Sequence, residues 1–208
     1  IGMRNIHFDS IEEYDDCSSL SQYQYALEEG FSKEQAHAFI EIMSRDNARY
    51  PVSWDSGEGA GFTRGTPWMK VNPDHDQINI ETQRKDPGSL LSFYKRLIAL
   101  KKSPAFFHVL ALGELQPVLE EYPYIFAYSR DDGEKKLFVI CNYHSDGCRV
   151  EWKEAGSVLL NNYDKLDRDE KGLCLEPFQA VILEAEREPF TLTRAILLTR
   201  DGAENILT

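Results

Sequence analysis

Residues 86–104 read DPGSLLSFYKRLIALKKSP, and this stretch divides a helical part of the chain from a β part. Asp86-Pro87 is a helix start signal, because a carboxylate can cap free backbone amides and proline suits the first helical position. Ser103-Pro104 ends the pattern. Between these signals apolar residues recur at helical spacing, at Leu90, Leu91, Tyr94, Leu97 and Ile98. We expect a helix over about 87–103 whose apolar stripe lies on a partner surface.

Residues 1 to about 50 are also helical in pattern. Apolar residues recur every three or four positions, at Ile11, Tyr14, Leu20, Tyr23 and Leu27. Gly30 breaks that run, and Ser32 with Gln35 forms a capping-box pair that starts a second helix. The apolar face of this second helix consists of Ala36, Phe39, Ile40 and Met43, and we expect it to end near Arg45.

Helical periodicity is absent between Pro51 and Asp86, where glycine and proline are dense. Three aromatic residues lie in this stretch: Trp54, Phe62 and Trp68. A structureless stretch of this length is usually functional or disordered, and the rings favour order. We therefore expect a folded loop that packs its own rings against a scaffold.

After Pro104 the apolar period changes to two, which is typical of strands. We expect a hairpin from residues 124–128 and 136–143, with Asp131-Asp132-Gly133 as its turn and Leu137, Val139 and Cys141 on one face. Further strands are expected at 107–112, 115–120, 148–153, 157–160, 172–175 and 178–184. Short strands at this spacing indicate a small antiparallel sandwich. The later apolar run Ala195–Leu198 fits a helix, a strand or a junction sequence.

Charge and cysteine content exclude several classes of protein. The 208 residues carry 23 basic and 35 acidic side chains, a net charge of -12, which disfavours binding to nucleic acid or to anionic membranes. No apolar run approaches the ~20 residues of a membrane span, and polar residues interrupt any signal-like segment at the start.

The four cysteines form no C-x-x-C, so we expect free thiols in a cytoplasmic protein, with a Cys141–Cys148 disulfide as the alternative. Because the chain starts at Ile1, we expect it to be part of a longer protein.

The sequence predicts neither a metal site nor a cofactor site. The five histidines lack ligand spacing, and Asp74-His75-Asp76 fits a solvated loop better than a cation site. No nucleophile elbow and no phosphate-binding glycine loop occurs.

One polar cluster does stand out: residues 44–55 read SRDNARYPVSWD. Arginine offers five donors in a planar fork, which suits vicinal hydroxyls or a carboxylate. The cluster is therefore either a ligand site or an Arg–Asp network that holds the loop in shape.

This cluster also carries a resemblance. Together with AGFT at 60–63 and PWMKVNP at 67–73, it resembles the α-glucosidase branch of the α-amylase superfamily, of oligo-1,6-glucosidase, dextran glucosidase or trehalose-6-phosphate hydrolase type. The opening IGMRNIHFDSIEEY looks like the segment after barrel strand eight in that family. The resemblance implies an α+β fragment: the last loop and helix of a TIM (β/α)8 barrel over 1–104, a small antiparallel β-sandwich domain over 105–186, and a tail of unknown structure over 187–208.

The resemblance implies retaining hydrolysis of α-1,6 or α-1,4 glucosidic bonds at the non-reducing end of short gluco-oligosaccharides. The catalytic Asp, Glu and Asp of the family lie on earlier strands, so no catalytic residue is expected here and the chain alone should be inactive. Arg45 matches the family's substrate-binding arginine, and Asp46, Asn47 and Arg49 are expected to shape the loop beside it. The expected partner is a gluco-oligosaccharide, bound only with the missing part of the barrel. Linkage preference and oligomeric state stay open.

Two residues depart from the family pattern. Serine stands near Cys17-Ser18-Ser19, where family members often carry a glutamate, which leaves linkage preference open. Tyr50 replaces a threonine, and we expect its bulk to reshape the mouth of the site.

The alternative function is a non-catalytic carbohydrate-binding or interaction module of the same fold, with aromatic residues of the β domain as the platform.

Overall fold

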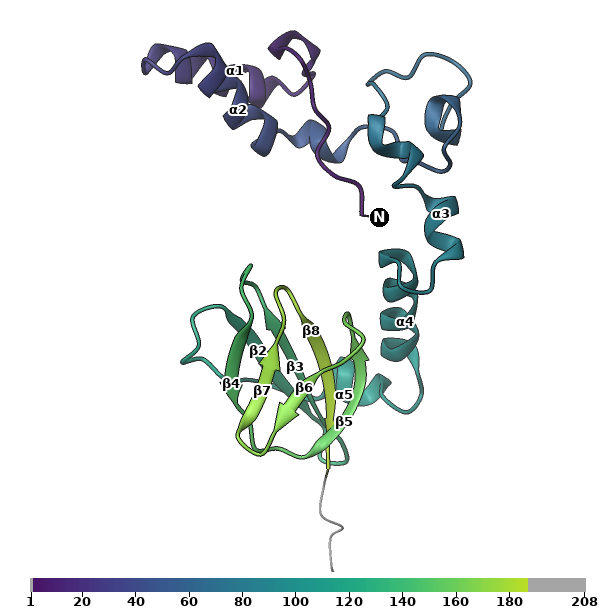
Figure 1. The fold of residues 1–208 in the computed structure, drawn as a ribbon, viewed down its shortest axis with the longest axis vertical. Helices are drawn as coiled ribbons and strands as arrows, with labels where there is room; N and C mark the ends of the chain where they lie inside the picture. The colour runs from purple at the N-terminus through teal and green to yellow at the C-terminus, as the bar shows by residue number, and fades with distance from the viewer. Residues whose placement is uncertain (1, 187–208) are drawn as a thin grey trace, which may run out of the picture. The chain divides into compact units, whose positions relative to one another are not determined.

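A computed structural model describes residues 2–186 of the chain (Figure 1). The chain divides into two compact units, with Arg96 in the first and Leu97 in the second. This division falls inside helix α4 (Leu90–Lys102), whereas the expected domain boundary near residue 104 stays a prediction. The expectation for Ala195–Leu198 lies outside the described residues. No helix in the described part of the chain is both long and apolar enough to cross a membrane.

The first unit is built from short helices around one small apolar core. In order they are η1 (Ile11–Glu13), α1 (Cys17–Glu28), α2 (Lys33–Met43), η2 (Arg45–Ala48), η3 (Glu58–Gly61), η4 (Pro73–Asp76), α3 (Ile80–Lys85) and the first part of α4. Helices α1 and α2 pack side by side (Figure 1). Their core contains Ile6, Phe8, Tyr14, Tyr23, Ala36, Ile40, Tyr50 and Met69.

The predicted capping box at the start of α2 is confirmed. The Ser32 hydroxyl accepts the Gln35 N–H at 3.2 Å, and the Gln35 side chain accepts the Ser32 N–H at 3.0 Å. Gly30, which separates α1 from α2, has a φ of 90°, a conformation that glycine adopts without the steric cost of a Cβ. The local chemistry of these residues thus determines the turn between the two helices.

The predicted start of the long helix is wrong by one turn. Helix α4 begins at Leu90, and the Ser89 hydroxyl accepts the Ser92 N–H at 3.2 Å. The Asp86 carboxylate instead accepts the N–H of Gly88 at 2.8 Å, so it closes a turn. Helix α3 was not predicted, and its cap is the Asn79 side chain, which accepts the Thr82 N–H at 2.8 Å.

The expected packing of the large rings of the loop over 51–86 against a scaffold is not seen within the described residues. Trp54, Phe62 and Trp68 are 47%, 48% and 62% exposed. The Trp54 N–H donates to the carbonyl of Ala60 at 2.8 Å, and Ala60 itself is fully buried. The backbone therefore closes this part of the loop around a small residue and leaves the large rings outside.

The second unit consists of two antiparallel sheets with a shared core. Its strands are β1 (Glu114–Pro117), β2 (Ile125–Asp131), β3 (Lys136–Asn142), β4 (Cys148–Glu151), β5 (Gly156–Asn161), β6 (Asp167–Asp169), β7 (Gly172–Leu175) and β8 (Ala180–Ala185). The sheet orders are β1-β2-β3-β8-β5 and β4-β7-β6. The shared core contains Ala127, Phe138, Ile140, Val150, Leu173, Leu175, Val181 and Leu183. All eight residues lie on strands, and both sheets contribute.

The predicted β2–β3 hairpin is confirmed, with Ile125 opposite Asn142 and Asp131 opposite Lys136. The Asp132 carboxylate accepts the N–H groups of Glu134 and Lys135 in its turn. Strand β6 was not predicted. All four cysteines are free, so the alternative of a Cys141–Cys148 disulfide is wrong.

The strand predicted over 107–112 is wrong, because these residues form helix α5 (Phe107–Leu112). A short apolar run cannot be assigned to strand or helix from its pattern alone. The helix contacts β2 and β3, and it buries Val109 completely. Gly113 ends it at a point where a Cβ would lie 2.5 Å from the Val109 carbonyl oxygen.

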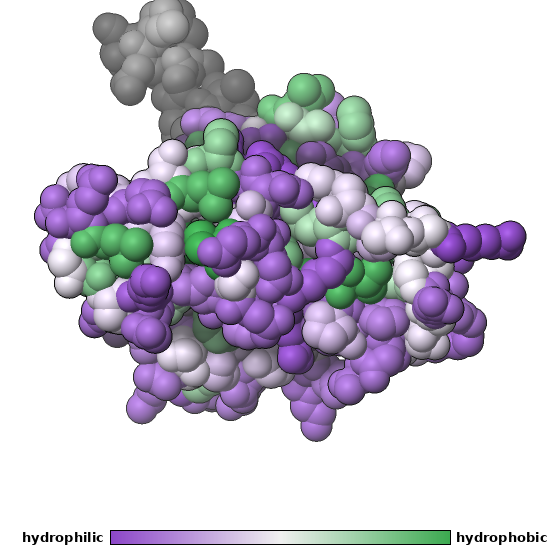
Figure 2. Space-filling model, turned by 90° about the horizontal axis from the view of Figure 1, so that it is seen from above, coloured by the Kyte–Doolittle hydropathy of each residue, from purple (hydrophilic) through white to green (hydrophobic). Residues whose placement is uncertain are grey.

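Helix α4 exposes its apolar stripe: Leu90, Tyr94 and Ile98 are all exposed, and the helix buries none of its residues. Figure 2 shows scattered apolar patches on a largely hydrophilic face. We expect amide hydrogen–deuterium exchange of the isolated chain to be faster over residues 1–103 than over 105–185, because amides without tertiary cover open locally. For the same reason, the amides of α4 should exchange faster than those of β3 and β8. Equal protection across both parts would contradict this expectation.

Ile140 is fully buried between the two sheets. We expect Ile140→Ala to lower the free energy of unfolding of the second unit by about 2–5 kcal/mol, because the substitution removes buried methyl groups and leaves a cavity. Leu115→Ala on β1 is the matched control, since Leu115 is 51% exposed. Urea unfolding followed by circular dichroism measures both, and equal effects of the two substitutions would contradict the assignment of the core.

Candidate functional site

The candidate site contains an arginine held by a buried carboxylate. Asp16 precedes the first residue of α1, and Arg45 is the first residue of η2. Arg45 Nε and Nη2 both donate to Asp16 Oδ1, at 3.1 and 2.5 Å. The Asp16 side chain is 3% exposed and the Arg45 side chain is 60% exposed. The pair therefore buries its negative end and presents the guanidinium to solvent.

Asp46 joins the two segments that carry this pair. Its side chain is fully buried, and Oδ2 accepts the backbone N–H groups of Asp15 and Asp16 at 2.8 and 2.9 Å. Its other oxygen lies 3.3 Å from Nη1 of Arg49. Asp46 therefore fixes the backbone in front of α1 against η2, and Arg49 partly balances the buried charge.

Two serines complete the contacts of the buried carboxylates. The Ser19 hydroxyl lies 2.8 Å from Asp16 Oδ2 and 2.9 Å from Ser44 Oγ. Ser44 Oγ accepts the N–H of Asp46 at 3.2 Å. Asp16 occupies the N-cap position of α1 without capping it, because its carboxylate binds Arg45 and Ser19 instead.

Asn47 ties η2 to the end of α2. Its Nδ2 donates to the Glu41 carbonyl at 2.9 Å. Its Oδ1 is buried and has no hydrogen-bond partner within residues 2–186. Asn47 thus has one structural contact and one unused acceptor.

The electrostatics of the pair favour full ionisation. The hydrogen bonds from Arg45 hold the pKa of the Asp16 carboxyl well below its ordinary value, against the opposing effect of burial, and the Ser19 hydroxyl lowers it further. The same contact raises the pKa of Arg45. At neutral pH the pair is therefore a carboxylate and a guanidinium with mutually compensated charge.

The structure brings the sequence-predicted residues Arg45, Asp46, Asn47 and Arg49 into one cluster. Sequence reasoning missed Asp16 and Ser19. The available signal was an aspartate in front of a helix followed three residues later by serine, and that pattern indicates a helix cap.

The expectation that Tyr50 reshapes the mouth of the site is wrong. Its ring is buried in the core of the first unit, and its hydroxyl donates to the Arg4 carbonyl.

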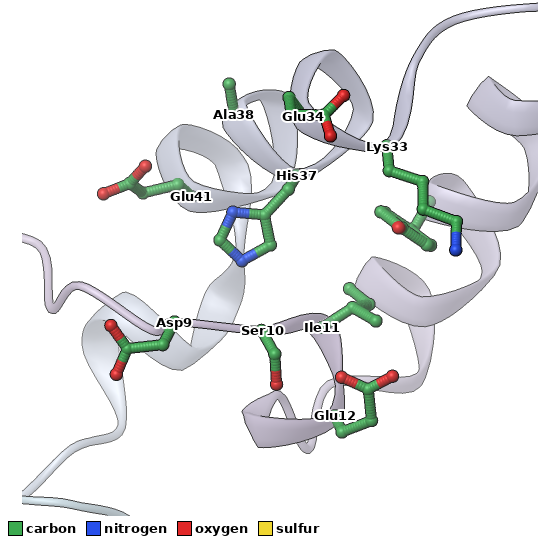
Figure 3. A pocket seen from close by; sticks show the side chains of 10 residues that line it. Asp9, Ser10, Ile11, Glu12, Lys33, Glu34, His37, Ala38 and Glu41 are labelled. Carbon is green, nitrogen blue, oxygen red and sulfur yellow. The ribbon is translucent and has the colours of Figure 1, made fainter.

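A separate cleft of about 450 Å³ lies between η1 and α2 (Figure 3). Its walls are largely polar or charged: Asp9, Ser10, Ile11, Glu12, Tyr23, Lys33, Glu34, His37, Ala38 and Glu41. Figure 3 shows His37 of α2 pointing toward the segment of Asp9 and Ser10. Within residues 2–186, no group of three or more His, Cys, Asp or Glu side chains could hold a metal ion.

Comparisons with known proteins point to one family. The family described as "Alpha amylase, catalytic domain" matches residues 1–108. Oligo-1,6-glucosidase of Halalkalibacterium halodurans is 37% identical over 194 residues, which cover 90% of this chain and 34% of that protein. Trehalose-6-phosphate hydrolase of Bacillus subtilis is 32% identical over 191 residues, covering 88% of this chain and 33% of that protein.

Solved structures agree with these matches. The crystal structure of trehalose-6-phosphate hydrolase from Bacillus licheniformis matches with a TM-score of 0.80 and 33% identity, over 89% of this chain and 34% of that one. Trehalulose synthase from Pseudomonas mesoacidophila matches with a TM-score of 0.76 and 28% identity, with the same coverage of 89% and 34%. The chain thus spans about a third of the length of the relatives that it matches.

The lowered pKa of Asp16 makes the stability of the first unit depend on pH. A carboxyl whose pKa is lower in the folded state stabilises the fold above its unfolded pKa of about 4, and this contribution is lost progressively as the pH falls from that value through the lower pKa of the folded state. We expect Asp16→Asn to lower the urea midpoint of the first unit at pH 7, and the difference from the wild type to narrow below about pH 4.

Urea unfolding from pH 7 to pH 3, followed by helical circular dichroism, measures this dependence. Asp15→Asn is the matched control, because the neighbouring Asp15 is exposed. A difference between wild type and Asp16→Asn that stays constant over the whole range would show that the Asp16 charge does not contribute.

Proposed function

The chain belongs to the α-amylase family, and we propose that it forms the C-terminal portion of a retaining glycoside hydrolase. The proposed enzyme cleaves α-1,6 or α-1,4 glucosidic bonds at the non-reducing end of short gluco-oligosaccharides. The observation that carries this proposal is Arg45, whose guanidinium is exposed to solvent while a buried carboxylate holds one of its edges.

In this proposal the first 104 residues complete the catalytic barrel, and α4 is its last helix. The match of residues 1–108 to the catalytic-domain family supports this division. The exposed stripe of Leu90, Tyr94 and Ile98 also supports it, because an apolar face of this kind marks an interface. Residues 105–186 then form the C-terminal β domain, and the enzyme works in the cytoplasm.

Arg45 is the proposed substrate-binding residue. Asp16 takes two of the five donors of the guanidinium, and the remaining N–H groups are available to hydroxyl oxygens of the terminal glucose. Asp46, Asn47 and Arg49 keep the loop in shape through their contacts with the backbone of Asp15 and Asp16, with Glu41 and with Asp46. None of these residues is proposed as nucleophile or acid/base.

A second candidate function has one observation in its favour. Three rings gather on the second unit, of which Phe126 and Tyr143 are exposed and Tyr128 is half-buried. The Phe126 ring centroid lies 5.7 Å from that of Tyr128 and 6.2 Å from that of Tyr143. Aromatic rings can stack on sugar faces, so a non-catalytic carbohydrate-binding module is the alternative. Titrating isomaltose or maltose while following the tyrosine ring signals by NMR separates the two functions. Shifts confined to these rings at millimolar sugar would favour the module.

The proposal predicts different behaviour for the isolated chain and for the complete enzyme. We expect no release of nitrophenol from p-nitrophenyl α-glucoside by residues 1–208, since the groups that form and break bonds lie elsewhere in the proposed enzyme. In the complete enzyme we expect Arg45→Ala to lower kcat/KM for isomaltose by about 10- to 100-fold, as for loss of a charge-assisted hydrogen bond.

Arg84→Ala is the matched control, because Arg84 is an exposed arginine of the same unit outside the cluster. Hydrolysis by the isolated chain, or equal effects of the two arginine substitutions, would overturn the proposal.

A further inference from the structure

We propose that Asp16 is a positioning residue for substrate binding, which holds the Arg45 guanidinium so that its free donors face the sugar. The inference rests on the proposed function and adds a residue that the sequence did not reveal. Asp16 acts only through Arg45 in this proposal and touches no substrate.

The first step of the argument is the direction of the contact. Arg45 Nε and Nη2 form one edge of a planar guanidinium, and both donate to the same oxygen of Asp16. Two hydrogen bonds from one edge to a single oxygen keep that edge of the group facing Asp16. The Nη1 donors and the second proton of Nη2 therefore point away from Asp16.

The second step is the rigidity of Asp16 itself. Its side chain is 3% exposed, its other oxygen contacts the Ser19 hydroxyl, and its backbone N–H is held by the fully buried Asp46. Arg49 Nη1 lies 3.7 Å from Asp16 and 3.3 Å from Asp46, so it contacts both carboxylates. The entropy of ordering Arg45 is thus lost on folding, and less remains to be lost when a sugar binds.

The third step separates positioning from simple cross-linking. The backbone before α1 is already fixed to η2 by the two N–H groups that Asp46 accepts. The Asp16–Arg45 contact is an addition to that tie, and it leaves the Arg45 side chain 60% exposed. The contact therefore orders a group that faces solvent.

The first test measures how firmly Arg45 is held in the isolated chain. NMR of the arginine side chains gives the solvent-exchange rate of each Nε–H group. We expect the Arg45 Nε–H to exchange at least about 10-fold more slowly than that of the exposed Arg84, and Asp16→Asn to remove the difference. Equal exchange at Arg45 and Arg84 in the wild-type chain would overturn the inference.

The second test is a double-mutant cycle in the complete enzyme, assayed on isomaltose. We expect Asp16→Asn to lower kcat/KM about 10-fold in the wild-type background, and to have almost no effect in the Arg45→Ala background. A residue with a merely structural role would lower activity in both backgrounds, so additive losses overturn the inference. Asp169→Asn is the control, because it breaks a similar pair with Arg149 in the second unit and should leave kcat/KM unchanged.

A second variant tests the inference if the Asp16→Asn protein does not fold. Arg45→Lys retains the charge but loses the planar fork, and we expect it to lose about as much kcat/KM as Asp16→Asn. Full activity of Arg45→Lys would overturn the inference. If the unmodified complete enzyme has no α-glucosidase activity, the proposed function itself is overturned. If the enzyme is active but the losses in the double-mutant cycle are additive, only the inference about Asp16 is overturned.

Discussion

The arrangement of the polar site depends on the buried carboxylate of Asp46. It accepts the backbone N–H groups of Asp15 and Asp16, which lie 31 and 30 positions earlier in the chain. A fully buried carboxylate without such donors would be very unfavourable, so the segment before α1 and the start of η2 are fixed together. The closeness of Asp16 to Arg45 follows from this tie. The geometry of the site therefore follows from the hydrogen bonds that the buried Asp46 carboxylate requires.

The two units differ in how completely their buried polar side chains are hydrogen-bonded. In the second unit Gln179 is fully buried, and its side chain bonds to Asn161, Lys165 and Glu176. In the described part of the chain, the buried side-chain atoms without a hydrogen-bond partner all belong to the first unit: Tyr14 Oη, His37 Nε2, Asn47 Oδ1 and Ser53 Oγ. Unpaired buried polar groups are costly, and this unit also carries the uncovered N-terminal part of α4. Both features support the proposal that the first unit completes a larger barrel.

Caps and turns that depend on neighbouring residues could be predicted from the sequence, whereas contacts between distant segments could not. The capping box of Ser32 and Gln35 and the turn at Asp132 follow from neighbouring residues, so spacing was enough to predict them. Helix α5 was missed because a six-residue apolar run fits either period. Arg45 could be proposed from its motif, but its partner Asp16 lies 29 positions away and imitates a helix cap. Only the fold shows that this carboxylate binds Arg45 and the Ser19 hydroxyl instead of capping the helix.

The charge state of the pair bears on the kind of ligand that Arg45 suits. An isolated arginine attracts anions, whereas Arg45 shares its charge with a buried carboxylate in a chain of net charge -12. What it offers outward is directional hydrogen-bond donors with little net positive charge, which matches the neutral hydroxyls of a glucose better than a phosphate. Rigid donors of this kind discriminate by position, because a hydroxyl out of place leaves them unpaired. These properties support the proposed division of work, in which this portion holds the end of the sugar and the bond-breaking groups belong to the rest of the barrel.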